Sequence, residues 1–214
     1  IISNLSGADH LEVEPGLDAA RAVIVPRGYG YTVAATTGTI AAALAVNSSV
    51  FAMRLDPGSP YRAFIERVRL EFTTIVAFTV PVTAGRRLAL YRGSGAAAGG
   101  GNAIVPVNKH SATPPSEFNV AQGGDIRVST TGALTVTGIT FEATQFKECS
   151  LTHVGAAGAY KELIYDFSAS KNQPIQLEPG QLLAVRNPVA FDAGGTWQLQ
   201  ITVDWHEALA LDYA

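Results

Sequence analysis

The sequence predicts an all-β protein, an antiparallel β-sandwich of the jelly-roll type. The strongest observation is residues 195–206, where apolar side chains occupy the odd positions and polar side chains the even positions. Successive side chains of a strand point to opposite faces, so this alternation predicts one long closing strand with a buried and an exposed face. Roughly ten short strand patterns, spaced about 8–15 residues apart and without a convincing amphipathic helix, complete the prediction.

Residues 1–20 have a mixed pattern with turn signals and predict an extended N-terminal arm. Such an arm can reach a neighbouring subunit or remain a loose terminus. Residues 21–214 are predicted to form a single jelly-roll domain. Its first strands are expected at 22–25, 29–35 and 49–55, and 39–45 is either a strand or a helical turn.

The next strand is predicted over 64–73, with Phe64, Val68, Leu70 and Phe72 on one face. Residues 76–82 and 87–91 are expected to continue the sheet, joined by a turn at 83–85.

A long Gly/Ala-rich surface loop is predicted over about 93–124. Its first part, 93–101, is of low complexity and is expected to be flexible, and Pro114-Pro115 breaks the chain further on. Long loops on a rigid β scaffold are common places for contacts and recognition.

The C-terminal half returns to strands. A short strand is expected at 125–129, and a change of alternation at Gly138 predicts a β-bulge or a sharp bend. Residues 163–167 alternate again, and 175–185 predict a hairpin around Pro179-Gly180.

Composition indicates subunit contacts. Charged residues make up 15% of the 214 residues, against about 25% in an ordinary soluble domain, while apolar residues reach 47%. An ordinary β domain with an Ala- and Gly-rich surface would explain these values. An obligate homo-oligomer whose apolar excess lies between subunits explains them better, and a trimer is the first expectation.

Several classes of protein are not favoured. The net charge is −3 and Lys and Arg form no stripe, so nucleic-acid binding is not expected. No apolar stretch approaches the roughly 18 residues that a membrane helix needs. The single Cys149 cannot form an internal disulfide and is expected in or beside the core.

No catalytic residue, cofactor site or metal site is predicted, and the protein is not expected to be an enzyme. The histidines, His10, His110, His153 and His206, have no trustworthy zinc spacing. Asp204, His206 and Glu207 form the densest cluster; they could share a metal or a proton, but a solvated strand face is the favoured interpretation. Further weak motifs are Arg92-Gly93-Ser94-Gly95, Gly99-Gly100-Gly101-Asn102 and the glycosylation acceptor Asn47-Ser48-Ser49.

Two resemblances to known families add to this. The segment 177–188, a strand, a Pro-Gly-Gln turn and a second apolar strand, is similar to the end of many trimeric jelly rolls. These include tumour-necrosis-factor-like domains, C1q-like domains and viral capsid modules.

The segments 6–13, 34–45, 51–54 and 195–207 together resemble a group of tailed-bacteriophage virion proteins. This resemblance implies a location in the virion and a structural role, as an oligomeric capsid decoration or cement protein or a head–tail accessory protein. Its partners would be further copies of itself and the major capsid protein or other virion proteins, contacted through the arm and the loops.

The alternative function is a tail- or fibre-associated module that binds glycans of the host surface. Such sites expose aromatic side chains near acids and amides, and the candidates are Tyr29, Tyr31, Tyr61 and Tyr160. Tyrosines in β-sheets also serve as core or cross-strand packing, so each of the four has a structural interpretation.

Overall fold

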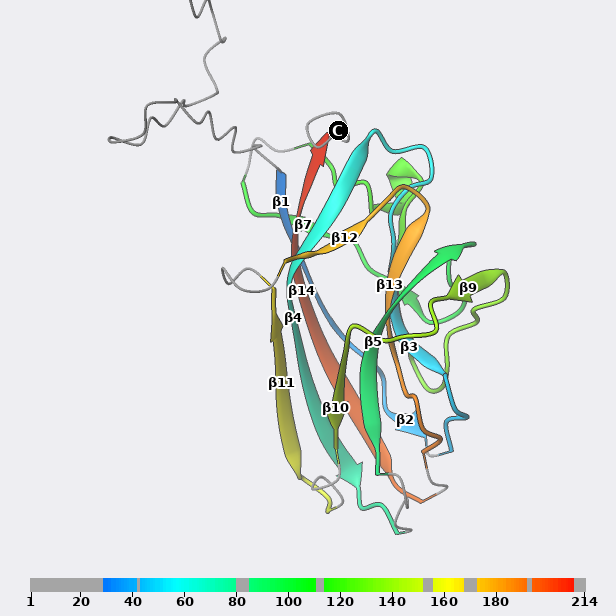
Figure 1. Ribbon diagram of the computed structural model, residues 1–214. Helices are drawn as coiled ribbons and strands as arrows, with labels where there is room; N and C mark the ends of the chain where they lie inside the picture. Colours follow the sequence, from blue (N-terminus) through cyan, green and yellow to red (C-terminus); the bar gives the residue numbers. More distant parts are fainter. Residues whose placement is uncertain are drawn as a thin grey trace, which may run out of the picture.

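The computed structural model describes residues 29–41, 43–79, 85–110, 114–151, 156–167, 173–191 and 194–209. They form two antiparallel sheets that pack against each other (Figure 1). The predicted arm at 1–20 and the short strand at 22–25 lie outside the described residues. No helix among the described residues is long and apolar enough to cross a membrane.

Sheet A contains the longest strands of the molecule. In spatial order it consists of β11 (Tyr160–Asp166), β4 (Tyr61–Val76), β14 (Thr196–Leu209), β1 (Tyr29–Thr36) and β7 (Val107–Asn108). Two short strands join it, β12 (Ile175–Leu177) beside β4 and β2 (Ile40–Ala41) beside β14.

Sheet B lies on the other side of the core. Its spatial order is β10 (Lys147–Ser150), β5 (Arg87–Gly95), β13 (Gln181–Arg186), β3 (Ser49–Arg54), β8 (Asp125–Val128) and β6 (Asn102–Ala103). The short strand β9 (Ile139–Phe141) also pairs with β5, and a 3-10 turn, η1, covers Val120–Gln122.

The connectivity is that of a jelly roll, as the sequence predicted. Four antiparallel pairs are nested along the chain: β1 with β14, β3 with β13, β4 with β11, and β5 with β10. The chain is therefore one long hairpin, folded so that β1, β4, β11 and β14 enter sheet A and β3, β5, β10 and β13 enter sheet B. Two packed antiparallel sheets with this winding define the jelly roll.

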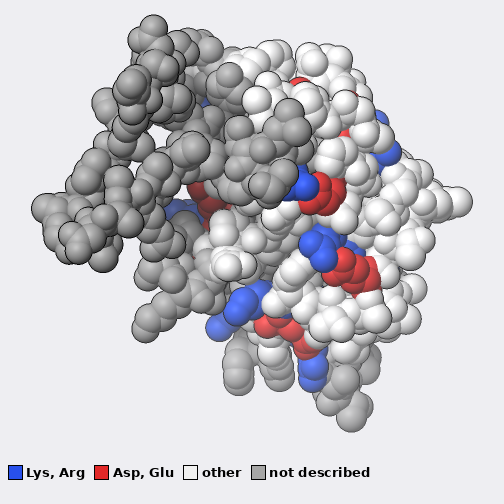
Figure 2. Space-filling model, turned by 45° about the horizontal axis from the view of Figure 1, so that its top comes forward, with Lys and Arg blue, Asp and Glu red and all other residues white. Residues whose placement is uncertain are grey.

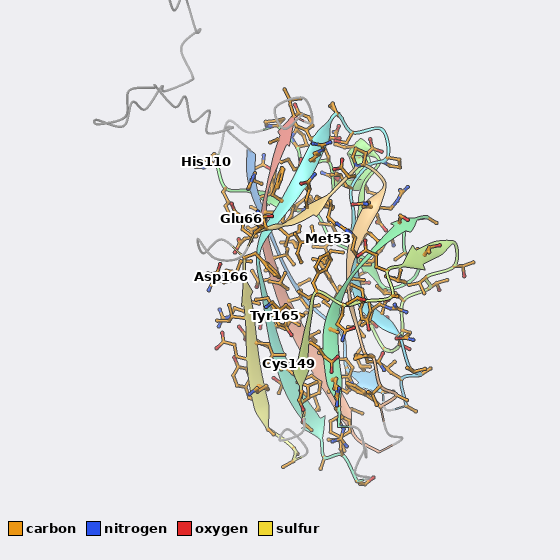
Figure 3. All side chains as sticks on the ribbon, in the orientation of Figure 1. Met53, Glu66, His110, Cys149, Tyr165 and Asp166 are labelled. Carbon is orange, nitrogen blue, oxygen red and sulfur yellow. The ribbon has the colours of Figure 1, made fainter. Side chains whose placement is uncertain are left out.

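The closing strand β14 confirms the predicted alternation. The side chains at positions 197, 199, 201, 203 and 205 are each 0% exposed, whereas Gln200 between them is exposed. β14 pairs with β4 on one side and with β1 on the other. The core between the sheets contains further large side chains such as Phe51 and Met53, and Figure 3 shows Met53 between the two layers.

One predicted face of β4 is wrong. Phe64 was expected on the core face with Val68, but the β4–β14 register shifts at Glu66, so that Asp204 lies opposite Arg67 and Trp205 opposite Ile65. An extra residue in one strand reverses the phase of alternation on its far side. Ile65 consequently enters the core, and the Phe64 ring stacks on His206 outside the core, with 4.9 Å between ring centroids.

The predicted hairpin over 175–185 is also corrected. The turn at Pro179-Gly180 is present, and its Gln181 N–H donates to the Glu178 carbonyl oxygen at 2.9 Å. Its two strands, however, belong to different layers: β12 pairs with β4 in sheet A, and β13 pairs with β3 and β5 in sheet B. The turn therefore carries the chain from one sheet to the other.

The strand predicted over 76–82 does not form as expected. β4 continues through Val76, residues 77–79 are not in a strand, and 80–84 lie outside the described residues. The strand that follows, β5, belongs to sheet B and does not continue the same sheet. Residues 39–45, left open between strand and helical turn, contribute the two-residue strand β2.

The segment 93–124, predicted as a long surface loop, lies against the sandwich and contributes two short strands to it. β6 pairs with β8 in sheet B and β7 pairs with β1 in sheet A, so the segment crosses between the sheets at one side of the sandwich. The glycine-rich part is not the flexible tip that was expected. A Cβ on Gly101, whose φ is +60°, would lie 2.2 Å from the Val128 carbonyl oxygen, so this close approach requires glycine.

Two smaller expectations are confirmed. Gly138 has a φ of +79° and occupies a tight turn in which the Ile139 N–H donates to the Val136 carbonyl oxygen at 3.2 Å. Cys149 is half-buried and packs against the core at the sheet edge formed by β10, near Tyr165 of β11 (Figure 3). Burial raises the pKa of the Cys149 thiol, so less of it is the reactive thiolate.

A pair of alanine substitutions tests the alternation of β14. Ile201→Ala removes a side chain that is 0% exposed, and we expect it to lower the free energy of unfolding by about 2–5 kcal/mol. Gln200→Ala, at the adjacent exposed position, should change it by less than about 0.5 kcal/mol. Urea denaturation measures both, and equal losses would contradict the assigned faces.

Candidate functional site

The cluster of Asp204, His206 and Glu207 does not form one site. Asp204 and His206 lie on the outer face of sheet A, where Asp204 forms an ion pair with Lys109 at 2.9 Å. His206 Nδ1 lies 2.9 Å from Glu66 Oε1. Glu207 points to the opposite face, and no group of three potential metal-binding side chains occurs among the described residues. The interpretation as a solvated strand face therefore holds for Asp204 and His206 alone.

Glu207 instead fastens the loop 93–124 to the end of sheet A. Its Oε1 accepts hydrogen bonds from Ser116 Oγ at 2.6 Å and from Trp205 Nε1 at 2.9 Å, and its Oε2 accepts one from the Glu117 N–H at 3.1 Å. Glu207 is 1% exposed. A buried carboxylate must be well hydrogen-bonded, and these three donors satisfy that need.

Aromatic contacts reinforce this attachment. The Phe118 ring packs edge-on against Trp205, with centroids 5.3 Å apart, and Tyr31 stacks on Trp205 at 5.8 Å. The Tyr31 hydroxyl donates to the Pro114 carbonyl oxygen at 3.0 Å. Residues 114–118 are thus part of the end of the sandwich.

The alternation of β14 already indicated that Glu207 contacts another segment of the chain. Odd positions from Trp197 to Trp205 face the core, so Glu207 continues the buried phase although it is charged. A carboxylate in a buried phase predicts a polar partner from another segment. Grouping Glu207 with its sequence neighbours Asp204 and His206 concealed that prediction.

The candidate tyrosines are not brought together. Tyr31 is 0% exposed and belongs to the core, and Tyr61 is half-buried. Tyr160, 52% exposed, lies opposite Thr73 of β4. Tyr61 lies 12 residues before Thr73 on the same strand, about 40 Å away. The side chain of Tyr29 is outside the described residues.

The two outer sheet faces differ in their cover. Segments between β5 and β10 fold over sheet B, and the Arg186 guanidinium lies 3.8 Å above the Phe141 ring there. This small apolar cluster consists of Ala52, Leu182 and Ala184 of sheet B with Ala98, Leu134, Ile139 and Phe141 above them. Among the described residues, sheet A has no comparable cover.

On the outer face of sheet A, β1 and β14 form a neutral wall, which we define as Thr32, Ala34, Thr36, Gln200 and Thr202. Ala34 lies opposite Thr202, and Thr36 lies opposite Gln200. All five side chains are half-buried or exposed. The wall offers small, uncharged side chains on a regular strand surface.

The other half of the same face, on β4 and β11, contains the tyrosine patch, which we define as Arg69, Glu71, Tyr160 and Glu162. Glu162 lies directly opposite Glu71, and like charges in that position repel. Arg69 offsets the repulsion, since its Nε lies 2.6 Å from Glu162 Oε1 and its NH2 2.8 Å from Glu71 Oε1.

Tyr160 belongs to the same electrostatic group. Partial desolvation, followed by the charges of Glu71 and Glu162, raises the pKa of its phenol, and Arg69 opposes them. Charged side chains in Figure 2 likewise occur as adjacent blue and red groups separated by neutral surface. The patch therefore combines an exposed ring with paired charged groups on neighbouring strands.

The weak motifs have structural explanations. Ser94 lies in strand β5 and lines a shallow hollow with Glu142, Thr140 and Gln181, without the strand-to-helix turn of a nucleophile elbow. Gly99 pairs with Thr135 instead of opening a phosphate-binding loop. Asn47 is exposed, and its carbonyl oxygen accepts hydrogen bonds from Arg186 at 2.7 and 3.1 Å.

The structure describes one of the remaining histidines. His110 is exposed near the outer side of sheet A (Figure 3), and His10 and His153 lie outside the described residues.

No protein-family model matches the sequence, and no curated protein is significantly similar to it.

The buried Glu207 makes a pH-dependent contribution to stability. Burial raises its pKa above the ordinary 4.5, although the hydrogen bonds from Ser116, Trp205 and Glu117 oppose the shift. The folded protein then holds this proton more tightly than the unfolded chain does. The contribution to the free energy of unfolding is complete below about pH 4.5 and declines as the pH rises through the folded-state pKa.

Glu207→Gln tests this assignment. We expect a loss of about 1–3 kcal/mol at pH 7, because the amide cannot accept all three hydrogen bonds. We also expect a smaller decline of stability from about pH 4.5 upward than in the parent protein. Some decline remains, because burial also raises the pKa of Glu117. Urea denaturation across pH measures both, with Glu142→Gln at an exposed position as control; an unchanged pH profile would refute the role of Glu207.

Proposed function

We propose that this protein is a non-enzymatic structural component of a bacteriophage particle, an oligomeric jelly roll that decorates or stabilises the capsid. A homotrimer is the proposed assembly, and its partners are further copies of the chain and other virion proteins. The jelly-roll architecture is common among viral capsid domains, although lectins share it. The sequence resemblance to tailed-phage virion proteins supports the viral assignment.

The observation that carries the proposal is the neutral wall on sheet A. Subunit association must remove water from both surfaces, and desolvating a charged group costs far more than desolvating an alanine or a threonine. The five wall side chains are uncharged, and they follow two adjacent strands. Interface centres are depleted of charged residues in the same way.

Exposed apolar side chains supply further contact area. Val105, between β6 and β7, and Val107, the first residue of β7, are 65% and 61% exposed. Because this segment is paired to both sheets, it presents the two valines from a fixed position. Fixed side chains lose little conformational freedom on binding, which favours association.

Glycan binding is the second candidate function. The exposed Tyr160 near Glu71 and Glu162 is the specific observation in its favour.

A lysine in the neutral wall tests the assembly. We expect Ala34→Lys, at an exposed wall position, to dissociate the oligomer because the new charge would have to be desolvated in the contact. Thr137→Lys, exposed in the turn before Gly138 on the covered side, adds the same charge outside the wall and should leave the mass unchanged.

Light scattering of the parent protein and both variants at several concentrations measures the mass. The expected parent mass is a multiple of the 22.4 kDa chain, and sedimentation with phage capsids then tests the proposed location. A parent protein that stays at 22.4 kDa and does not sediment with capsids would overturn the proposal.

A further inference from the structure

The tyrosine patch has the elements of a carbohydrate site. Tyr160 and Glu162 project from the same face of β11, and Glu71 and Arg69 project from the adjacent strand β4. Tyr160 lies opposite Thr73 of β4, two residues from Glu71, and is 52% exposed. We propose that this patch binds an uncharged hexose-based oligosaccharide.

The ring would provide the contact for the apolar side of the sugar. One side of a hexose ring carries mainly C–H groups, and an aromatic ring offers them a flat, partly apolar surface. Tyr160 is well placed for this contact because it begins the edge strand β11, so a ligand can approach from the side as well as from above.

The charged groups would bind the hydroxyls. Arg69 contacts Oε1 of Glu162 and Oε1 of Glu71, so each carboxylate has a second oxygen that can accept a hydrogen bond from a sugar hydroxyl. Hydrogen bonds to ionised acceptors are stronger than those between neutral groups. The ion pairs also hold the acceptors in place before the ligand arrives, which reduces the entropy lost on binding.

The charge of the patch defines the class of sugar. Two carboxylates and one guanidinium give a net charge of −1. The side chains of Arg69 and Glu162 are 43% and 36% exposed and are accessible to a ligand, whereas that of Glu71 is 19% exposed. A carboxylated sugar would be repelled. The proposed ligand is therefore neutral, and sialic acids and uronic acids are disfavoured.

The size of the patch fits one or two sugar rings. It spans two neighbouring strands, about 5 Å apart, and its long axis follows β11 over positions 160–162, roughly 7 Å. Such a shallow site has few contacts, so a single hexose should bind with a Kd on the order of 1 mM.

Saturation-transfer NMR on the full chain tests the proposal. The probes are the methyl glycosides of glucose, galactose, mannose and N-acetylglucosamine, with N-acetylneuraminic acid as the charged comparison. We expect saturation transfer to the ring protons of at least one neutral glycoside and none to N-acetylneuraminic acid. Tyr160→Ala should weaken binding about tenfold or more.

Leu209→Ala is the matched control. It serves this purpose better than Ile164→Ala, because Ile164 lies directly opposite Arg69 of the patch. Leu209 is 42% exposed and lies opposite Tyr61, at the other end of β4 from Tyr160, so its removal should leave sugar binding unchanged. Thermal unfolding confirms that both variants fold. The proposal is overturned if no neutral glycoside binds, if N-acetylneuraminic acid binds more tightly than all of them, or if both variants behave alike.

This test is independent of the proposed assembly. Ala34→Lys lies on β1, with β14 between it and β4, so the variant can lose oligomerisation while the patch remains intact. Sugar binding by a parent protein that is monomeric would contradict the assembly alone, and an oligomeric parent protein that binds no sugar would contradict the patch alone.

Discussion

The architecture depends on the position of β14 between β4 and β1. Every residue from Thr196 to Leu209 is paired with β4, and residues 200–207 are paired with β1 as well. Its inward side chains, from Trp197 to Trp205, fill the centre of the core, and burying large side chains of this kind is the main favourable contribution to folding. Because the strand alternates strictly, the same pairing places Gln200 and Thr202 on the outer face of sheet A. One strand thus sets both the core and the surface proposed for assembly.

The inward side chains at the two ends of β14 have different roles. Trp197 stacks on Phe72, with 5.0 Å between centroids, and belongs to the apolar core. Trp205 contacts Tyr31 and Phe118 and donates to Glu207, which joins the strand to residues 116–118. Different parts of the segment between β5 and β10 are therefore held in different places. Residues 116–118 lie at the end of sheet A, β6 and β7 lie along the side of the sandwich, and Ala98, Leu134 and Phe141 cover sheet B. This cover leaves sheet A as the more accessible face among the described residues.

Local alternation was sufficient to predict much of this fold. The period-two patterns predicted β14, β3 and β11, and the turn residues predicted the bend at Gly138 and the turn at Pro179-Gly180. Which strands pair with one another could not be derived from local alternation. The sequence of the turn at Pro179-Gly180 is compatible with a flat hairpin and with a crossing between the two sheets. The pairing of β12 with β4 shows that the chain crosses between the sheets here. The bulge at Glu66 likewise depends on β14, because an extra residue is defined only relative to its partner strand.

The candidate sites were harder to predict, since their members are distant in sequence. Arg69 and Glu162 are 93 residues apart, and Ser116 and Glu207 are 91 residues apart. No spacing rule connects such pairs, because strand order alone makes them neighbours. Tyr160 was recognised by residue type, and Tyr31 was selected by the same criterion although it is a core residue. Exposure, which the sequence does not reveal at a strand edge, separates the two.

In the proposed assembly, sheet A meets a second copy of the chain through its neutral wall, whereas sheet B is covered by loops of its own chain. Distances between nitroxide labels on neighbouring subunits, measured by pulsed electron paramagnetic resonance, test it most directly. One label is placed at Ala34→Cys and, in a separate protein, one at Thr137→Cys, both with Cys149→Ser. We expect short distances between subunits from position 34 and longer distances from position 137. Shorter distances from position 137, or no coupling at either position, would contradict it.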